Sequence, residues 1–185
     1  MNTMSRAVLA LYSYDKQSSE NTAEHEIDTA LSLIARLPLI MVYAYAVKIR
    51  SFWGDSMIMH PPIKELSTAE NILSTLRPDR KYTHEEAKLL DLMLMLHAEH
   101  GGGNNSTFTC RVLTSSGTDP YSAYSAAIGS LKGPRHGGAN HKVTEMHNYI
   151  KENVSDWTDE SELADYLRKI LLKETGDKSG LIYGM

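Results

Sequence analysis

The sequence has almost no cysteine, no excess of positive charge and no long apolar run, and each shortage excludes a class of protein. Cys110 is the single cysteine among 185 residues, so no internal disulfide can form, which suits a reducing cytoplasm. The net charge of −4 argues against general nucleic-acid binding, because no large basic face offsets the phosphate charge. The longest apolar stretch, residues 37–47, is interrupted by Pro38 and is too short to span a bilayer. No export signal is recognisable, so we expect a cytoplasmic protein that binds neither nucleic acid nor membrane.

The remaining composition is that of an ordinary globular protein. Hydrophobic residues make up 42% of the chain and charged residues 23%, so a core and a solvated surface can both form. A chain of this length can bury one domain, or one domain and part of a second.

Apolar residues recur every three or four positions through most of the chain, which is the spacing of amphipathic helices. Alternating β-branched runs are rare, and the best of them covers only residues 107–112. Three pairs predict capping boxes at helix starts: Asn21 with Glu24, Ser67 with Glu70, and Thr83 with Glu86. The sequence therefore predicts an all-α protein.

Prolines and caps predict further helix boundaries. Pro38 should kink or restart the helix that begins near residue 21, because its ring removes a backbone donor and clashes with the preceding turn. Asp119-Pro120 is typical of a helix start. The following residues 121–131 are rich in Ala, Ser and Gly, so that a neighbouring helix can pack very close to them.

Three more helices are predicted towards the middle and end of the chain. The helix over residues 85–99 is expected to turn these side chains inward: Leu89, Leu90, Met93, Leu94 and Leu96. Residues 142–153 and 160–174 have amphipathic patterns, and Thr158 or Asp159 is expected to open the second of these helices.

The residues best suited to chemistry lie between positions 94 and 140. His97 and His100 are three residues apart at the end of a predicted helix, so both imidazoles can face one ligand. A glycine run, residues 101–103, follows them, and His136 also has glycines nearby. Glycines let the backbone approach a ligand closely, and a neutral histidine at a helix N-terminus can donate to a developing oxyanion.

Other interpretations of these residues are weaker. A zinc site is disfavoured, because the metalloprotease helix needs histidines at i and i+4 and no second cysteine is present. The pair His97 and His100 can also simply stabilise a helix C-terminus through its dipole. Neither a P-loop nor a GxSxG elbow is present in the sequence. Cys110 is better interpreted as a small core residue than as a nucleophile.

In order, spacing and identity, three segments resemble the bacterial type of the citrate synthase family: LHAEHGGGNNST, SSGTDPYSAYSAAIGSLKGPRHGGAN and SGLIYGM. The resemblance implies part of a helical large domain over residues 1–133, the start of a small domain over residues 134–185, and a homodimer. It further implies the tricarboxylic acid cycle reaction that makes citrate and CoA from acetyl-CoA, oxaloacetate and water. This is an acyl transfer in which the acyl group becomes alkyl. Acetyl-CoA is then a co-substrate, and no cofactor is bound permanently.

The same resemblance assigns roles to individual residues. His136 is the catalytic histidine that hydrogen-bonds the thioester oxygen as the enol forms. His100 binds oxaloacetate, and His97 and Asn104 lie at the same site. The start of the loop that holds the adenine of CoA corresponds to five residues: Leu181, Ile182, Tyr183, Gly184 and Met185.

Residues that the family carries further along have no counterpart in this chain. They are a histidine that polarises the ketone of oxaloacetate, the arginines that clamp its carboxylates, and the aspartate that removes the methyl proton. Losing a general base typically costs about 10²–10⁴-fold in rate. We therefore expect an internal piece of a citrate synthase that is inactive alone. The alternatives are a 2-methylcitrate synthase, a citryl-CoA-cleaving relative, or a non-catalytic helical dimerisation fragment.

All of these assignments to one substrate site depend on a single spatial expectation. His97, His100 and His136 should converge around one small pocket that is held by packed helices.

Overall fold

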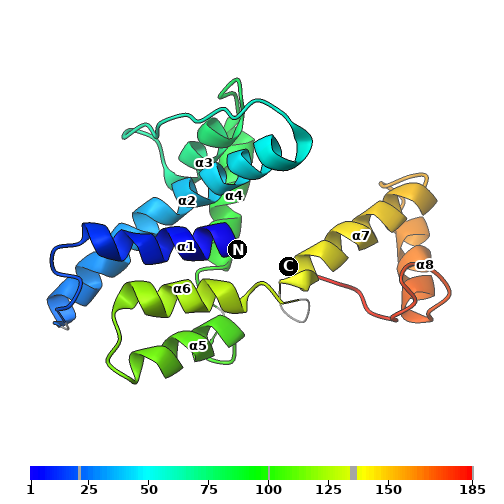
Figure 1. Ribbon diagram of the computed structural model, residues 1–185. Helices are drawn as coiled ribbons and strands as arrows, with labels where there is room; N and C mark the ends of the chain where they lie inside the picture. Colours follow the sequence, from blue (N-terminus) through cyan, green and yellow to red (C-terminus); the bar gives the residue numbers. More distant parts are fainter. Residues whose placement is uncertain (21, 100, 134–136, 185) are drawn as a thin grey trace. The chain divides into compact units, whose positions relative to one another are not determined.

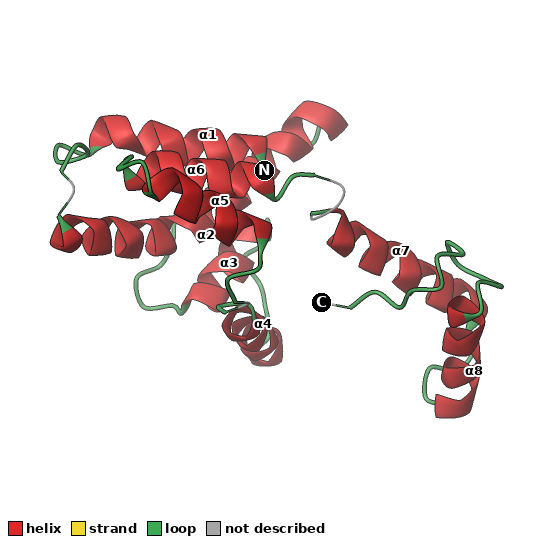
Figure 2. Cartoon of the chain, turned by 90° about the horizontal axis from the view of Figure 1, so that it is seen from below, coloured by secondary structure: helices red, strands yellow, loops and turns green. Residues whose placement is uncertain are grey.

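The computed structural model describes residues 1–20, 22–99, 101–133 and 137–184. Its regular elements are α1 (Asn2–Leu11), the 3-10 turn η1 (Tyr12–Tyr14), α2 (Ala23–Trp53), α3 (Thr68–Leu76), α4 (His84–Leu96), α5 (Asn105–Thr114), α6 (Pro120–Ser130), α7 (Gly138–Asn153) and α8 (Glu160–Leu171) (Figure 1). No strand occurs in this described part of the chain (Figure 2). The all-α prediction is confirmed, and residues 107–112 lie in α5.

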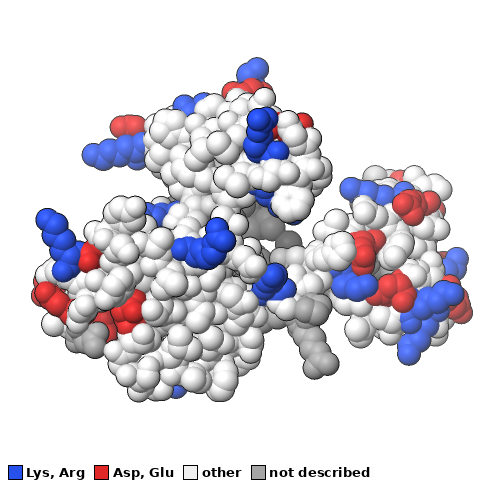
Figure 3. Space-filling view, viewed as in Figure 1, with Lys and Arg blue, Asp and Glu red and all other residues white. Residues whose placement is uncertain are grey.

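The chain divides into two compact units, unit 1 (Met1–Leu131) and unit 2 (Lys132–Met185). The expected domains, residues 1–133 and 134–185 of a large and a small domain, stay a prediction. The surfaces of the two units differ. In Figure 3, charged side chains of both signs are spread over the visible face of unit 1 with wide uncharged areas between them, whereas they lie close together on the visible face of unit 2.

In unit 1, α6 lies between α1 and α5, as Figure 1 shows. Small residues bring α1 and α6 close together. The Ser5 hydroxyl donates to the backbone oxygen of Ser125 at 2.7 Å, and the Ser125 hydroxyl donates back to the backbone oxygen of Ser5 at 2.9 Å. Nearby, Val8 is fully buried in a small cluster with Leu33 and Tyr121. The close packing expected from the Ala-, Ser- and Gly-rich segment is confirmed.

The helix α2 is continuous through Pro38, so of the two expected effects of this proline the restart is wrong, and the kink stays a prediction. A proline inside a helix typically costs about 3 kcal/mol, and the packing of this 31-residue helix against α1 and α3 offsets that loss. At its start, Thr22 is the N-cap and its side chain accepts from the amide of His25. The expected cap Asn21 lies outside the described residues.

The apolar stretch of α2 is longer than the sequence suggested. Within the described residues, α2 is the one helix long and apolar enough to cross a membrane, with a mean hydropathy of 1.8 over its most apolar window. The expectation that this stretch is too short to span a bilayer is therefore wrong on length and composition. A single such helix is weak support for a membrane span, because the core helix of a soluble protein meets the same criteria.

The helix α4 buries less of its apolar surface than predicted. Leu90 and Met93 are half-buried, but Leu89, Leu94 and Leu96 are exposed, which corrects the expectation that all five point inward. In the described part of the chain α4 packs mainly against α3, so only one narrow side of it is covered. Periodicity identifies an apolar face but not what covers it.

Helix caps follow the sequence closely. Of the three predicted capping boxes, those at Ser67 and at Thr83 are present, and Asp119 caps α6 with Pro120 at its first position. Asp159, the second of the two expected candidates, caps α8.

In unit 2, α7 and α8 pack around a core of five buried residues: Met146, Ile150, Val154, Tyr166 and Ile170.

Candidate functional site

His97 is the C-cap of α4, and its own helix orients its ring. Its Nδ1 lies 2.7 Å from the carbonyl oxygen of Met93. A carbonyl can only accept, so Nδ1 carries the hydrogen in this contact. The Nε2 atom is then an acceptor in the neutral ring and a donor in the imidazolium. The exposed side chain can therefore contact a hydroxyl group in one state and a carboxylate in the other.

Residues 101–104 lead into α5. Gly101 has φ +71°, a left-handed conformation that favours glycine, and its amide donates to the Glu99 carboxylate at 2.5 Å. Asn104 is the N-cap of α5. Its side-chain oxygen accepts from the backbone amide and the hydroxyl of Ser106, at 2.8 and 2.5 Å. The cap thus occupies the oxygen of Asn104 and leaves its NH2 group as the donor for a ligand.

Two of the predicted site histidines, His100 and His136, lie outside the described residues. The expected convergence of His97, His100 and His136 around one pocket therefore stays a prediction.

The predicted CoA segment of unit 2 is described from Leu181 to Gly184, and Met185 lies outside the described residues. Leu181 and Ile182 are exposed, whereas Tyr183 packs against the core formed by α7 and α8. The Tyr183 hydroxyl donates to the carboxylate of Asp177 at 2.9 Å. Hydrogen bonds from Ser179 and Tyr183, together with the nearby ammonium of Lys142, hold the pKa of the Asp177 carboxyl far below its usual range.

An ion pair beside α4 helps to fix the helix that carries His97. The guanidinium of Arg77, at the end of α3, donates twice to the carboxylate of Glu86, at 2.9 and 2.6 Å. These bonds and the backbone amide of Thr83 lower the pKa of Glu86 to about 2.

Sequence reasoning missed a second group of titratable residues in unit 1. The Nε2 atom of His25 lies 3.2 Å from the Asp15 carboxylate, and the hydroxyl of Tyr121 donates to the same oxygen at 2.8 Å. Burial alone would raise the pKa of Asp15, but hydrogen bonds from Gln17 and Tyr121 and the charge of His25 outweigh it and lower that pKa. Ten and 106 residues separate Asp15 from its partners, so no local motif could reveal the group.

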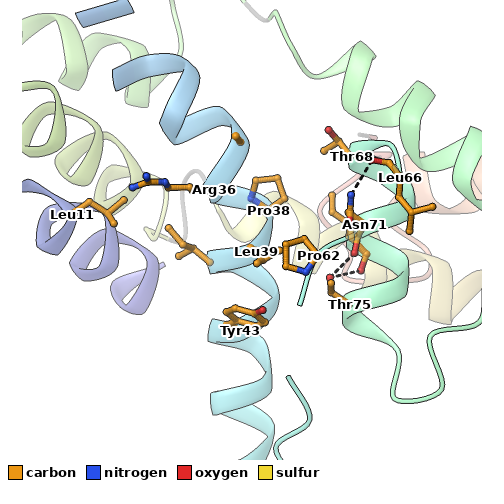
Figure 4. A pocket seen from close by; sticks show the side chains of 13 residues that line it. Leu11, Arg36, Pro38, Leu39, Tyr43, Pro62, Leu66, Thr68, Asn71 and Thr75 are labelled. Atoms are coloured by element: carbon orange, nitrogen blue, oxygen red, sulfur yellow. Dashed lines mark hydrogen bonds between the residues drawn. The ribbon is translucent and has the colours of Figure 1, made fainter. Parts of the chain in front are cut away.

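An apolar groove of about 450 Å³ lies in unit 1 (Figure 4). It is lined mainly by apolar side chains of α1, α2 and α3, among them Leu11, Leu39 and Ile72. Arg36 is the only charged side chain among its described lining residues, and neither His97 nor Asn104 reaches it. The groove suits an apolar segment better than an anionic substrate. Among the described residues, no group of three His, Cys, Asp or Glu side chains is placed to hold a metal ion.

Comparison with known proteins gives a consistent result. The sequence profile of the family described as "Citrate synthase, C-terminal domain" matches residues 1–185. The 2-methylcitrate synthase 2 of Corynebacterium glutamicum is 37% identical over 154 residues, which cover 81% of this chain and 38% of that protein. The citrate synthase of Acidithiobacillus ferridurans is 36% identical over 151 residues, covering 79% and 37% of the two chains. Citrate synthase 1 of Mycobacterium tuberculosis is 31% identical over 183 residues, covering 96% and 39%.

Solved structures show the same likeness in three dimensions. The citrate synthase of Pyrobaculum aerophilum matches 94% of this chain and 41% of its own, with a TM-score of 0.68 and 28% identity. The citrate synthase of Thermotoga maritima matches in fold, with a TM-score of 0.60 at 24% identity over 98% of this chain and 42% of its own. The chain thus spans about two fifths of the length of the relatives it matches.

Proposed function

Because the chain belongs to the citrate synthase family, we propose that it forms part of an enzyme that condenses acetyl-CoA with oxaloacetate and water to give citrate and CoA. The family match over residues 1–185 carries this proposal. The reaction is an acyl transfer in which the acyl group becomes alkyl, and acetyl-CoA enters as a co-substrate.

The proposed roles of the site residues follow from the chemistry of the reaction. Removing a proton from the acetyl methyl group needs a donor at the developing enolate oxygen, and His136 is the proposed donor. His100 and His97 are proposed to bind oxaloacetate. The outward Nε2 of His97 supports this, because it donates to a carboxylate when the ring is protonated. The NH2 group of Asn104 is the proposed neighbouring donor.

A specific observation supports a second acyl-CoA as the alternative co-substrate. A 2-methylcitrate synthase is 37% identical to this chain, and a citrate synthase is 36% identical over a similar length. The two activities differ by one methylene in the acyl group. A hydrophobic pocket discriminates such a difference by only about 1–3 kcal/mol, so a few lining residues can decide it. Propionyl-CoA is therefore the alternative co-substrate.

We also propose that the working enzyme is a cytoplasmic homodimer. Exposed apolar side chains run along α2 and α4 of unit 1, including Ile34, Phe52 and Leu96. Large apolar side chains exposed in such number are typical of regions that another protein surface covers. The 185 residues alone are expected to be inactive, because the chain spans about two fifths of the length of its relatives.

A thiol-release assay and calorimetry test this proposal together. The isolated chain should release no CoA from acetyl-CoA and oxaloacetate, and robust turnover would refute the expected inactivity. It should still bind oxaloacetate at millimolar concentration. His97→Ala should weaken that binding about tenfold, the loss of one hydrogen bond to a charged group.

The matched control is His147→Ala, which removes an exposed histidine of α7 in unit 2. It should leave oxaloacetate binding unchanged. A wild-type chain that gives no heat with oxaloacetate would favour the non-catalytic helical fragment. Preferred turnover of propionyl-CoA by a longer protein that contains this chain would assign it to 2-methylcitrate synthesis.

A further inference from the structure

A network of side chains in unit 2 ties the end of the described chain to α7. The carboxylate of Asp177 accepts from the backbone amide of Ser179 at 3.0 Å and from the Tyr183 hydroxyl at 2.9 Å. The Lys142 ammonium on α7 lies 3.3 Å from the same carboxylate and 2.9 Å from Glu145. We call the four residues Lys142, Asp177, Ser179 and Tyr183 the Asp177 clasp.

The clasp closes a short loop upon itself. The Ser179 hydroxyl accepts from the backbone amide of Leu181 at 3.2 Å and lies 3.1 Å from the hydroxyl of Tyr183. The ring of Tyr183 packs against the core of α7 and α8. The Asp177 side chain is only 18% exposed, so the carboxylate holds these donors with little competition from water.

The backbone of this segment has a shape that a free peptide seldom adopts. Gly176, Lys178 and Gly180 all have positive φ, at 67°, 57° and 76°. A left-handed lysine is strained, and at Gly180 a Cβ would lie 3.2 Å from the backbone oxygen of Leu171. Such a conformation persists only where surrounding contacts select it, and the clasp supplies those contacts.

The clasp leaves the apolar tip of the segment uncovered. Leu181 and Ile182 are exposed while Tyr183 and Asp177 anchor the residues on either side. A flat aromatic base such as adenine can pack on aliphatic side chains presented in this way.

We propose that Asp177 is a positioning residue, which holds residues 177–184 in their receptive conformation before CoA arrives. This inference rests on the proposed function, because the CoA role of the segment comes from the family. Asp177 itself contacts no ligand in this proposal and acts through Ser179, Tyr183 and Lys142.

Two measurements on the same variants test the proposal. Hydrogen exchange reports whether the backbone of residues 178–184 is fixed in one conformation. A titration with CoA, followed by NMR, reports the affinity of the chain for CoA. In Asp177→Ala, the amides of the segment should exchange at least about tenfold faster, because the hydrogen bonds that closed the loop are gone. CoA should bind about two- to tenfold more weakly, since the ligand must now order the loop itself.

Two gentler variants keep the test informative if Asp177→Ala folds poorly. Asp177→Asn keeps an acceptor for the Ser179 amide but loses the charge opposite Lys142, so both effects should be intermediate. Lys142→Met removes only a half-exposed ion pair and should have the smallest effect of the three. The matched control is Asp165→Asn, which breaks the exposed pair with Arg168 on α8 and should change neither quantity.

Each outcome separates the two claims. Weaker CoA binding without faster exchange would mean that Asp177 acts by direct contact, which would overturn the positioning role. Faster exchange with unchanged CoA affinity would overturn it as well. If the wild-type chain binds no CoA, the proposed CoA role of the segment fails, and the exchange rates alone decide whether Asp177 holds the loop.

Discussion

In unit 2, α7 and α8 pack their apolar faces against each other, and Ile170 at the centre is only 2% exposed. In unit 1, α2 and α4 are more apolar than α7 and α8, yet many of their large side chains face outward, including Ile34 at 68% exposed. Figure 3 shows a related contrast in charge, because charged side chains are widely spaced on the visible face of unit 1 and close together on that of unit 2.

The two units differ in burial because the helices that pack together are close in sequence in unit 2 and far apart in unit 1. The helices α7 and α8 are consecutive, so one short stretch of the chain supplies the residues on both sides of their core. In unit 1, α1 packs on α6 across more than a hundred residues, and the 31-residue α2 has more apolar surface than its neighbours α1, α3 and α6 cover. The core of unit 2 is thus formed within one stretch of the chain, whereas in unit 1 many large apolar side chains of α2 and α4 stay exposed.

The largest expected effect is the loss of stability caused by a substitution in the core of unit 2. Ile170→Ala should lower the free energy of unfolding of unit 2 by about 2–5 kcal/mol, because it leaves a cavity where the side chain is fully packed. Leu172→Ala is the control two residues further on, at a position 67% exposed, and should cost less than about 0.5 kcal/mol. Urea unfolding followed by circular dichroism measures both. Equal losses for the two variants would contradict a self-contained core.

A second effect, of intermediate size, concerns how the stability of each unit changes as the pH falls. The pKa of Glu86 is about 2 in the folded protein, and that of an ordinary glutamate is about 4.3. Because the folded pKa is lower, the stabilisation from Glu86 is complete above the unfolded pKa and disappears as the pH falls through about 2. Unit 1 should therefore lose stability between about pH 4.5 and 2.

Glu86→Gln should flatten this loss in unit 1 and leave the acid response of unit 2 unchanged. The pKa of Asp177 is also lowered, so Asp177→Asn should flatten the response of unit 2 in the same direction. Glu85→Gln is the control, since it removes the neighbouring carboxylate, for which the described residues provide no arginine partner. The measurement is urea unfolding at a series of pH values, and an unchanged slope in Glu86→Gln would contradict the role of the Arg77 pair.

The smallest expected effect on stability tests the open surface of unit 1. Ile34→Glu should change the free energy of unfolding by no more than about 0.5 kcal/mol, because the side chain is already exposed. If this face meets a second copy of the chain, the same variant should shift sedimentation toward the monomer, because it places a charge in an apolar contact. Thr158→Glu, on the exposed loop before α8, adds the same charge elsewhere and should leave the association state unchanged.

Local signals in the sequence were reliable at most helix ends, although the N-cap of α2 is Thr22 and not the expected Asn21. The capping boxes at Ser67 and Thr83 form as predicted, because cap and partner are three residues apart. The expected restart at Pro38 failed, because the packing of α2 along its length outweighs one lost hydrogen bond. The inward face expected for α4 failed in part, because periodicity does not say how many neighbours a helix has.

The candidate site divides in the same way. The place of His97 at the end of a helix followed from the sequence, whereas the place of Asn104 at the start of α5 did not. The tautomer of His97 and the clasp around Asp177 did not, because they depend on which carbonyl or hydroxyl lies within hydrogen-bond distance. The group formed by Asp15, His25 and Tyr121 was also invisible, since α2 and α6 bring it together from distant positions.

By itself, the sequence determined the family, the helical class and the positions of most caps, because each depends on residues that are neighbours along the chain. Only the tertiary structure decided which apolar faces are covered and which charged groups are held by others. Both features depend on the distances between helices, because the free energy of a buried contact or a hydrogen bond becomes negligible once the two groups are a few ångströms further apart.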